Sequence, residues 1–204
     1  MKEHLYSRYL PEITKLLTHT DAQKISEQMA QYTAAKVEEY ATDVITPKGQ
    51  TNIPRLITQL LASVKIDGLC FVAPYISEYF INELIVPSPI PRIICLTNKN
   101  PPKYTKHALQ TLVSLGKQKR KQVYIGLYKN KFLHVKMAIP FQYVMYQGEK
   151  IPSVPFVISG SMNFTQNGIL RNEEVIFILK HPTTVQHCYQ HFRQLWKHAK
   201  AFYP

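Results

Sequence analysis

Two short polar motifs interrupt apolar segments of this chain, and their residue types suit phosphate chemistry. The first is His134-Val-Lys136 and the second is Ser161-Met-Asn163. Side chains alternate along an extended strand, so we expect His134 and Lys136 to share one face. For the same reason we expect Ser161 and Asn163 to share a face. Each motif therefore places two polar groups together in an otherwise apolar environment.

A bound phosphate would give these polar groups a common partner. Burying them without one would cost free energy. Lys136 would bring charge, Ser161 and Asn163 would donate hydrogen bonds, and His134 could attack phosphorus or transfer a proton. The alternatives are an edge strand from which Lys136 extends into solvent, and a turn formed by Ser161 and Asn163. The combination of the two motifs favours a phosphate site.

A carboxylate that could assist the imidazole follows the second motif. Only three acidic residues lie beyond position 83, and two of them are Glu173 and Glu174. Asn172 and Glu174 are two apart at the start of an expected strand, so they would share a face. A carboxylate beside an imidazole fixes its tautomer and supports its positive charge. We therefore assign Glu174 to the site as the partner of His134, and expect Glu173 to be a solvated surface charge.

The net charge of +12 is concentrated in the middle of the chain. Residues 84–148 contain eleven Lys and Arg and no Asp or Glu. A field of one sign attracts polyanions, and beside a phosphate-like motif it favours nucleic acid as the partner. The alternatives are a solvated helix face with a basic loop, and contact with anionic lipid headgroups. The expected nucleic-acid contacts are Lys117, Lys119, Arg120, Lys121, Lys129 and Lys131.

Alternating helical and apolar extended segments predict an α/β fold. The nearly continuous apolar strands indicate a mixed sheet with helices on both faces. We expect a helical N-terminal extension over residues 1–50 and one domain over 51–204. The expected helices are 2–17, 21–41, 55–65, 77–85, 103–118 and 183–199. The expected strands are 69–73, 92–96, 122–127, 132–139, 154–160 and 174–179, with a hairpin turn at 147–150.

Composition and the lack of other motifs exclude several classes. No run of about 18 apolar residues exists, so no membrane span is expected, and the start lacks the apolar core of a secretory signal. The three cysteines are widely spaced and odd in number, which argues against disulfides and zinc and favours a cytoplasmic location. There is no G-x-G-x-x-G, Walker loop or His-Glu-x-x-His. We expect no cofactor and no metal. Residues 1–43 hold seven acidic and five basic side chains, so we expect them to contact protein rather than DNA.

Taken together, the motifs resemble those of the phospholipase D superfamily, in particular its small nucleases. The resemblance rests on His134-x-Lys136, Gly160-Ser161-x-Asn163-Phe164-Thr165 and Asn172-x-Glu174. The segment 190–196 is similar to the final helix of that fold, and the match extends over roughly 55–200. It implies a phospholipase D-like mixed sheet and a metal-independent phosphodiesterase, with DNA favoured over RNA as the substrate.

The resemblance also implies a mechanism and an assembly. Only one copy of the motif set is present, which in this family implies a homodimer with the two His134 side chains facing each other across the phosphate. One His134 would form a phosphohistidine and the other would protonate the leaving oxygen and then activate water. Lys136 and Asn163 would hold the phosphoryl oxygens, Ser161 would orient a partner or contact phosphate, and Glu174 would hold His134.

One position departs from the family pattern. The family usually has an Asp five positions beyond the Lys, and here that residue is Phe141. Two other functions therefore stay open: a phospholipase or phosphatidyl transferase of the same fold, and a non-catalytic nucleic-acid-binding protein with a degenerate site. His198-Ala-Lys200 repeats the His-x-Lys spacing at the end of an expected helix, where residues two apart do not share a face. We expect no functional role there.

Overall fold

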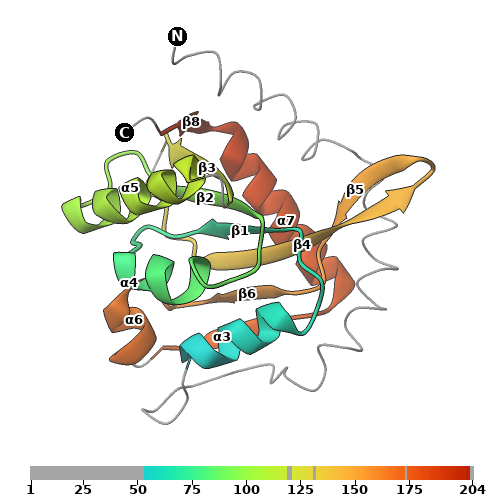
Figure 1. Cartoon of the computed structure of the whole chain (residues 1–204), viewed down its shortest axis with the longest axis horizontal. Helices are drawn as coiled ribbons and strands as arrows, with labels where there is room; N and C mark the ends of the chain where they lie inside the picture. The colour runs from blue at the N-terminus through green and yellow to red at the C-terminus, as the bar shows by residue number, and fades with distance from the viewer. Residues whose placement is uncertain (1–52, 119–120, 131, 173, 203–204) are drawn as a thin grey trace.

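The protein is built around one mixed β-sheet (Figure 1). The computed structural model describes residues 53–118, 121–130, 132–172 and 174–202, so the expected helices at 2–17 and 21–41 lie outside the described residues. The strand order is β7-β6-β4-β1-β2-β3-β8, and β5 pairs with β4 outside this path. The strands are β1 (Gly68–Val72), β2 (Arg92–Asn98), β3 (Gln122–Tyr128), β4 (Met137–Tyr146), β5 (Glu149–Ser153), β6 (Val157–Gly160), β7 (Ile176–Leu179) and β8 (Ala199–Ala201).

The strand directions bring the ends of several strands to one edge of the sheet. β1, β2 and β3 are parallel, whereas β4 runs antiparallel to β1 and to β6, and β6 runs antiparallel to β7. Met137 lies opposite both Val72 and Ser159, and Gly160 lies opposite Ile176. The carboxyl ends of β1 and β6 therefore meet the amino ends of β4 and β7. We call this edge of the sheet the motif edge.

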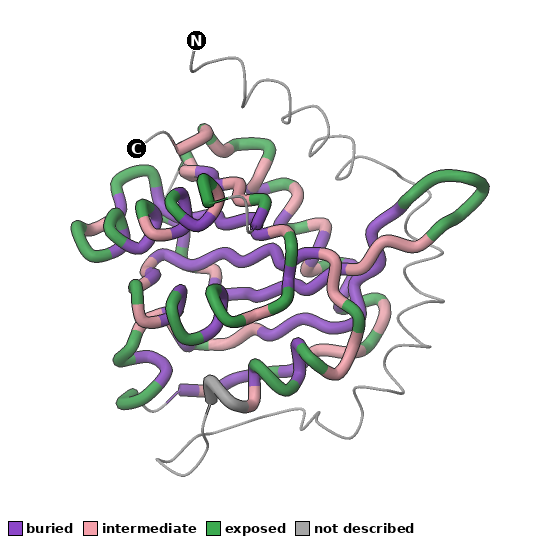
Figure 2. Tube along the Cα trace, in the orientation of Figure 1, coloured by how far each residue is buried: buried purple, intermediate pink, exposed green. Residues whose placement is uncertain are grey.

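Helices cover both faces of the sheet, as predicted. One face packs beneath a set of short and medium helices around Phe71 and Phe164, and the other packs beneath one long helix around Val72 and Phe192. Figure 2 shows that the strands between them are buried over most of their length. The first set is α3 (Ile53–Ala62), α4 (Glu78–Phe80), the π-helix η2 (Ile81–Ile85), α5 (Lys103–Lys117) and α6 (Gln166–Leu170), and the long helix is α7 (Pro182–Lys197). Within the described residues, none of the helices combines the length and the apolar character needed to cross a membrane.

The strands next to the motifs have different bounds from those predicted: β4 is shifted toward the C-terminus, and β6 and β7 are shorter. β4 begins at Met137, so His134 and Lys136 precede the strand rather than lying in it. Ser161 and Asn163 likewise follow β6, and Glu174 precedes β7. The physical reason is that side chains bond the backbone at these positions and replace the ladder of the sheet. Strand β8, which pairs with β3, was not predicted.

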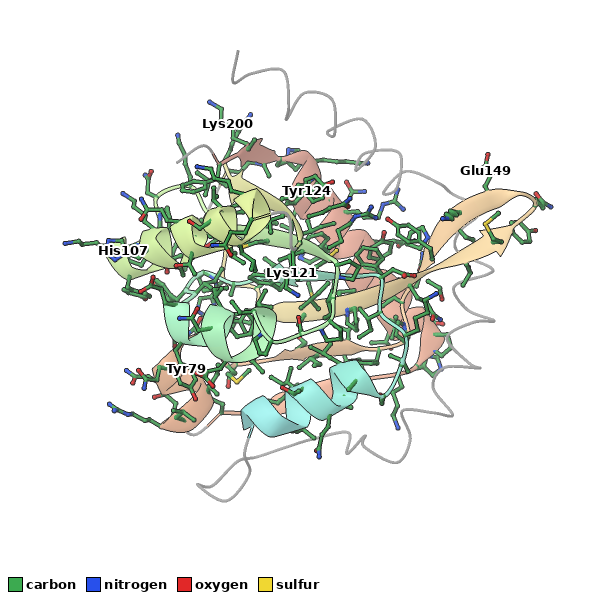
Figure 3. The ribbon with its side chains drawn as sticks, in the orientation of Figure 1. Tyr79, His107, Lys121, Tyr124, Glu149 and Lys200 are labelled. Carbon is green, nitrogen blue, oxygen red and sulfur yellow. The ribbon has the colours of Figure 1, made fainter. Side chains whose placement is uncertain are left out.

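A hairpin extends from the sheet at the far end of β4. Gln147 and Gly148 have φ values of 48° and 81°, and positive φ at both central residues suits the tight turn that joins two antiparallel strands. The turn predicted at 147–150 is thus confirmed, between β4 and β5. Figure 3 places Glu149 near the tip of this hairpin, away from the motif edge.

Phe141, the departure from the family pattern, is a core residue. It is 3% exposed and belongs to the cluster beneath α7. It lies directly opposite Gly68 on β1, and a Cβ built on Gly68 would fall 2.1 Å from its ring. The ring therefore occupies the space that the glycine leaves. Phe141 is five positions from Lys136, or about 16 Å along an extended strand, so the ring lies well away from the motif edge.

Candidate functional site

The His134 segment is held in place by a side chain from the end of β2. Asn98 Nδ2 donates a hydrogen bond to the carbonyl oxygen of Leu133 (3.3 Å), and the Leu133 amide donates to Asn98 Oδ1 (2.7 Å). Both Asn98 and Leu133 are buried, whereas His134 is exposed. Because Leu133 is fixed through both backbone groups, the adjacent imidazole is directed outward. Asn98 was not predicted; the signal was a polar side chain at the carboxyl end of a buried parallel strand.

Lys136 lies beneath the imidazole. Its Nζ is 3.1 Å from His134 Nε2, 3.3 Å from Nδ1 and 3.0 Å from the His134 carbonyl oxygen, to which it donates. The side chain is 6% exposed. Burial lowers the pKa of Lys136, and the negative charge of Glu174 opposes part of that change. The segment thus presents an exposed imidazole directly over a buried ammonium group.

Ser161 and Glu174 form the other half of the arrangement. Ser161 Oγ donates to Glu174 Oε2, and Asn172 Nδ2 donates to Glu174 Oε1 (3.1 Å). Ser161 is also bonded to the backbone of Val175, through its amide and through Oγ, at 3.0 Å each. A Cβ on Gly160 would lie 2.0 Å from the Val175 carbonyl oxygen, so this approach of the two segments requires glycine.

Asn163 contributes an unpaired polar atom. Its Oδ1 is buried and has no hydrogen-bond partner among the described residues. The segment after it is well fixed, because Thr165 Oγ1 accepts a hydrogen bond from the Gly168 amide (3.2 Å) and caps α6. A buried amide oxygen without a partner costs free energy unless a ligand or a second group satisfies it. Asn163 therefore offers a buried acceptor that no described residue satisfies, next to the Ser161 segment.

One predicted contact differs in the structure. The carboxylate of Glu174 was expected to hold His134, but its hydrogen bonds in the described chain go to Ser161 and Asn172. The imidazole instead contacts Lys136. Within the described chain Glu174 therefore bonds Ser161 and Asn172, and its negative charge acts to raise the pKa of Lys136. The described residues contain no group of three or more His, Cys, Asp or Glu that could hold a metal ion.

The lysines predicted to contact nucleic acid lie in different parts of the fold. Lys117 is exposed at the last residue of α5, whose 15 residues span about 22 Å from the motif edge. Lys129 is exposed just beyond β3, at the motif edge itself. Lys119, Arg120 and Lys131 lie outside the described residues.

The structure corrects one of the predicted nucleic-acid contacts, Lys121. It is buried, and its Nζ donates to the carbonyl oxygens of Ser88 and Ile90, the latter at 2.9 Å (labelled in Figure 3). Burial also lowers its pKa. Its ammonium group is committed to fixing the loop before β2, so the prediction that it contacts nucleic acid is wrong. The exposed cations that the sequence reasoning missed at the motif edge are Lys99, Lys103 and Lys106.

The chain is similar to proteins of known family and fold. Residues 61–196 match the family model described as "Cardiolipin synthase, PLD-like domain". A search among curated proteins gives no sequence match.

Solved structures that share the fold include the following three. Nuc from Salmonella typhimurium, a phospholipase D family member, has a TM-score of 0.56 and 15% identity, covering 79% of this chain and 98% of Nuc. NucT from Helicobacter pylori has a TM-score of 0.52 and 16% identity, covering 78% and 97%. Phosphatidylserine synthase from Haemophilus influenzae Rd KW20 has a TM-score of 0.51 and 11% identity, covering 78% and 39%.

Proposed function

The chain belongs to the phospholipase D-like family, and from this we propose that it is a metal-independent DNA endonuclease with a composite active site in a homodimer. The family's general reaction is cleavage or transfer at a phosphodiester bond. The observation that carries the proposal is the exposed imidazole of His134 above the buried ammonium of Lys136. Asn163 and the Ser161–Glu174 pair lie at the same edge of the sheet, as the strand pairing requires.

The proposed reaction has two steps. An imidazole nitrogen of His134 attacks phosphorus while the bond to the leaving oxygen breaks, and His134 of the second subunit gives its proton to that oxygen. Water then attacks the phosphohistidine, loses a proton to the second imidazole and releases the first. Lys136 and Asn163 offset the charge that develops on the phosphoryl oxygens. Two subunits are needed because each chain has one such imidazole in its motif set.

Charge at the motif edge supports DNA as the substrate. Lys99, Lys103, Lys106 and Lys129 are exposed there, and the chain has no Asp or Glu between positions 84 and 148. Phosphate contacts by such side chains give affinity that falls steeply with salt. A second candidate is a phosphatidyl transferase, which the description of the matching family model favours.

Substrate choice and metal independence can be tested together. Purified protein is incubated with labelled single-stranded DNA, duplex DNA, RNA and phosphatidylglycerol vesicles, each with Mg²⁺ and each with excess EDTA. We expect cleavage of DNA at the same rate in both conditions, because the His134–Lys136 arrangement supplies the nucleophile and the positive charge. His134→Ala protein purified identically controls for contaminating nucleases. Loss of cleavage in EDTA would contradict the mechanism, and turnover of lipid alone would favour the second candidate.

The composite site predicts how mixed subunits behave. Equal amounts of wild-type and His134→Ala chains are refolded together, so that subunits exchange. If both imidazoles are needed, only wild-type pairs are active, and the activity should be about a quarter of that of the same total amount of wild-type protein. Subunits that act independently would retain about half. A wild-type and His198→Ala mixture, which should keep full activity, serves as the control.

The position of Lys136 predicts the alkaline limb of the pH profile. Burial lowers the pKa of Lys136, so the ammonium should lose its proton at a lower pH than an ordinary lysine, and kcat should fall there. Glu174→Gln removes the charge that opposes this change, so the limb should move to still lower pH. Ser161→Ala removes a hydrogen bond to Glu174 but leaves the charge of Glu174 unchanged. This variant should keep the alkaline limb of the pH profile where it is in the wild type. An unmoved limb in Glu174→Gln would exclude Lys136 as its origin.

A further inference from the structure

A row of aromatic rings leads away from His134 along the motif edge. The centroid of the Phe132 ring is 6.0 Å from that of His134, the Tyr75 ring is 6.3 Å from Phe132, and the Tyr104 ring is 6.4 Å from Tyr75. We call Phe132, Tyr75 and Tyr104 the aromatic row. They come from three separate segments, namely the approach to β4, the loop after β1 and the first turn of α5. The fold therefore assembles the row from residues far apart in the sequence.

The rings of the aromatic row are exposed to solvent, although aromatic rings usually pack in the core. Phe132 is 62% exposed and Tyr104 is 48% exposed, and Tyr75 is partly buried between them. Fully burying an aromatic ring stabilises a fold, so rings left in solvent next to one another indicate a contact surface rather than a packing role. The ring planes are tilted by 39° to 53° along the row, so the rings do not stack on one another.

Exposed lysines flank the residues of the row in the sequence. Lys103 and Lys106 lie on either side of Tyr104 in the sequence of α5, and Lys99 begins the loop that leads to this helix. Lys129 lies three residues before Phe132. All four side chains are exposed. Rings that offer stacking faces between lysines are what single-stranded nucleic acid requires, since bases stack on the rings while phosphates meet the cations.

Building on the proposed function, we propose that the aromatic row binds unpaired bases, so that the substrate is single-stranded or locally unpaired nucleic acid. In a duplex the faces of the bases are covered by their neighbours and cannot contact the rings. Phe132 is the first ring of the row after the imidazole, so a base held there would place the adjoining phosphate near His134. The row would thus act in positioning and in strand preference.

Binding measured without turnover tests this proposal. Fluorescence anisotropy in EDTA compares a labelled thymidine oligonucleotide, an abasic oligonucleotide of equal length and charge, and a duplex, at one salt concentration. We expect the wild type to bind the thymidine strand most tightly. Phe132→Ala and Tyr104→Ala should each weaken that binding roughly 5- to 150-fold and leave abasic binding unchanged. Phe132→Trp should keep the preference.

Tyr146→Ala is the matched control. Tyr146 is an exposed tyrosine on the β4–β5 hairpin, about 30 Å along β4 from the motif edge, and its loss should change no affinity. Equal wild-type affinity for the thymidine and abasic strands would overturn the inference, as would an equal loss for both strands in the alanine variants. DNA cleavage without a preference for the strand that carries bases would overturn this inference but not the proposed function. A base preference without cleavage would support it as a binding site and contradict only the proposed catalysis.

Discussion

Replacing His134 with alanine should lower the rate of DNA cleavage by about 10⁴-fold or more while leaving the fold intact. The substitution removes the proposed nucleophile and, in the dimer, the proposed general acid as well. The imidazole is exposed, and Lys136 keeps its hydrogen bond to the carbonyl oxygen of residue 134, so little packing is lost. Single-turnover cleavage of labelled DNA measures the rate, and the thermal unfolding midpoint checks the fold.

His198→Ala is the matched control for this experiment. His198 and Lys200 repeat the His-x-Lys spacing later in the chain, and His198 is also exposed. The His198 carbonyl accepts a hydrogen bond from the Lys129 amide, which a side-chain change retains. Its activity should equal that of the wild type. Full activity in His134→Ala would contradict the proposed role of His134, as would an equal loss of activity in His134→Ala and His198→Ala.

Replacing Phe141 with aspartate should destabilise the protein by about 3–5 kcal/mol and should not raise activity. The change restores the residue type that the family usually has, but here it removes a buried ring and places a carboxylate in an apolar cluster. It also leaves a space above Gly68 that the ring now fills. Urea unfolding gives the free energy of unfolding, and cleavage is measured at a temperature where both proteins are folded.

Phe141→Leu separates the packing effect from the charge. It keeps an apolar side chain and should cost about 1 kcal/mol. Higher activity in Phe141→Asp than in Phe141→Leu would show that the missing carboxylate limits catalysis. Equal activity, with the larger loss of stability in Phe141→Asp, would show that Phe141 serves the core of this protein.

The site could be predicted from the sequence to the extent that it depends on local spacing. His134 and Lys136 are two residues apart, as are Asn172 and Glu174, and such short separations fix which groups lie together in any extended segment. The paired strands and the hairpin turn at 147–150 follow from apolar runs and turn residues in the same way. The exact strand ends could not be predicted from local sequence. The side chains of Asn98 and Ser161 bond the backbone of Leu133 and Val175, which are distant in the chain.

Charge was predicted less well than spacing, because burial depends on the whole fold. In the sequence, Lys121 is one of several adjacent cations, and only the loop before β2 turns its ammonium inward. The same holds in the opposite sense for Lys99, Lys103 and Lys106, which the parallel strands bring to the motif edge. Position in a basic run therefore identified Lys129 but missed the other three cations at the motif edge.

The sequence by itself determined the family and which residues make up the candidate site, through residues that lie close together in the chain. The tertiary structure alone decided that Glu174 bonds Ser161 rather than His134, that Phe141 fills the space above Gly68, and that Phe132, Tyr75 and Tyr104 form one row. These are contacts between residues far apart in sequence. They depend on how strands, loops and helices pack together in space, which the spacing of neighbouring residues in the chain does not specify.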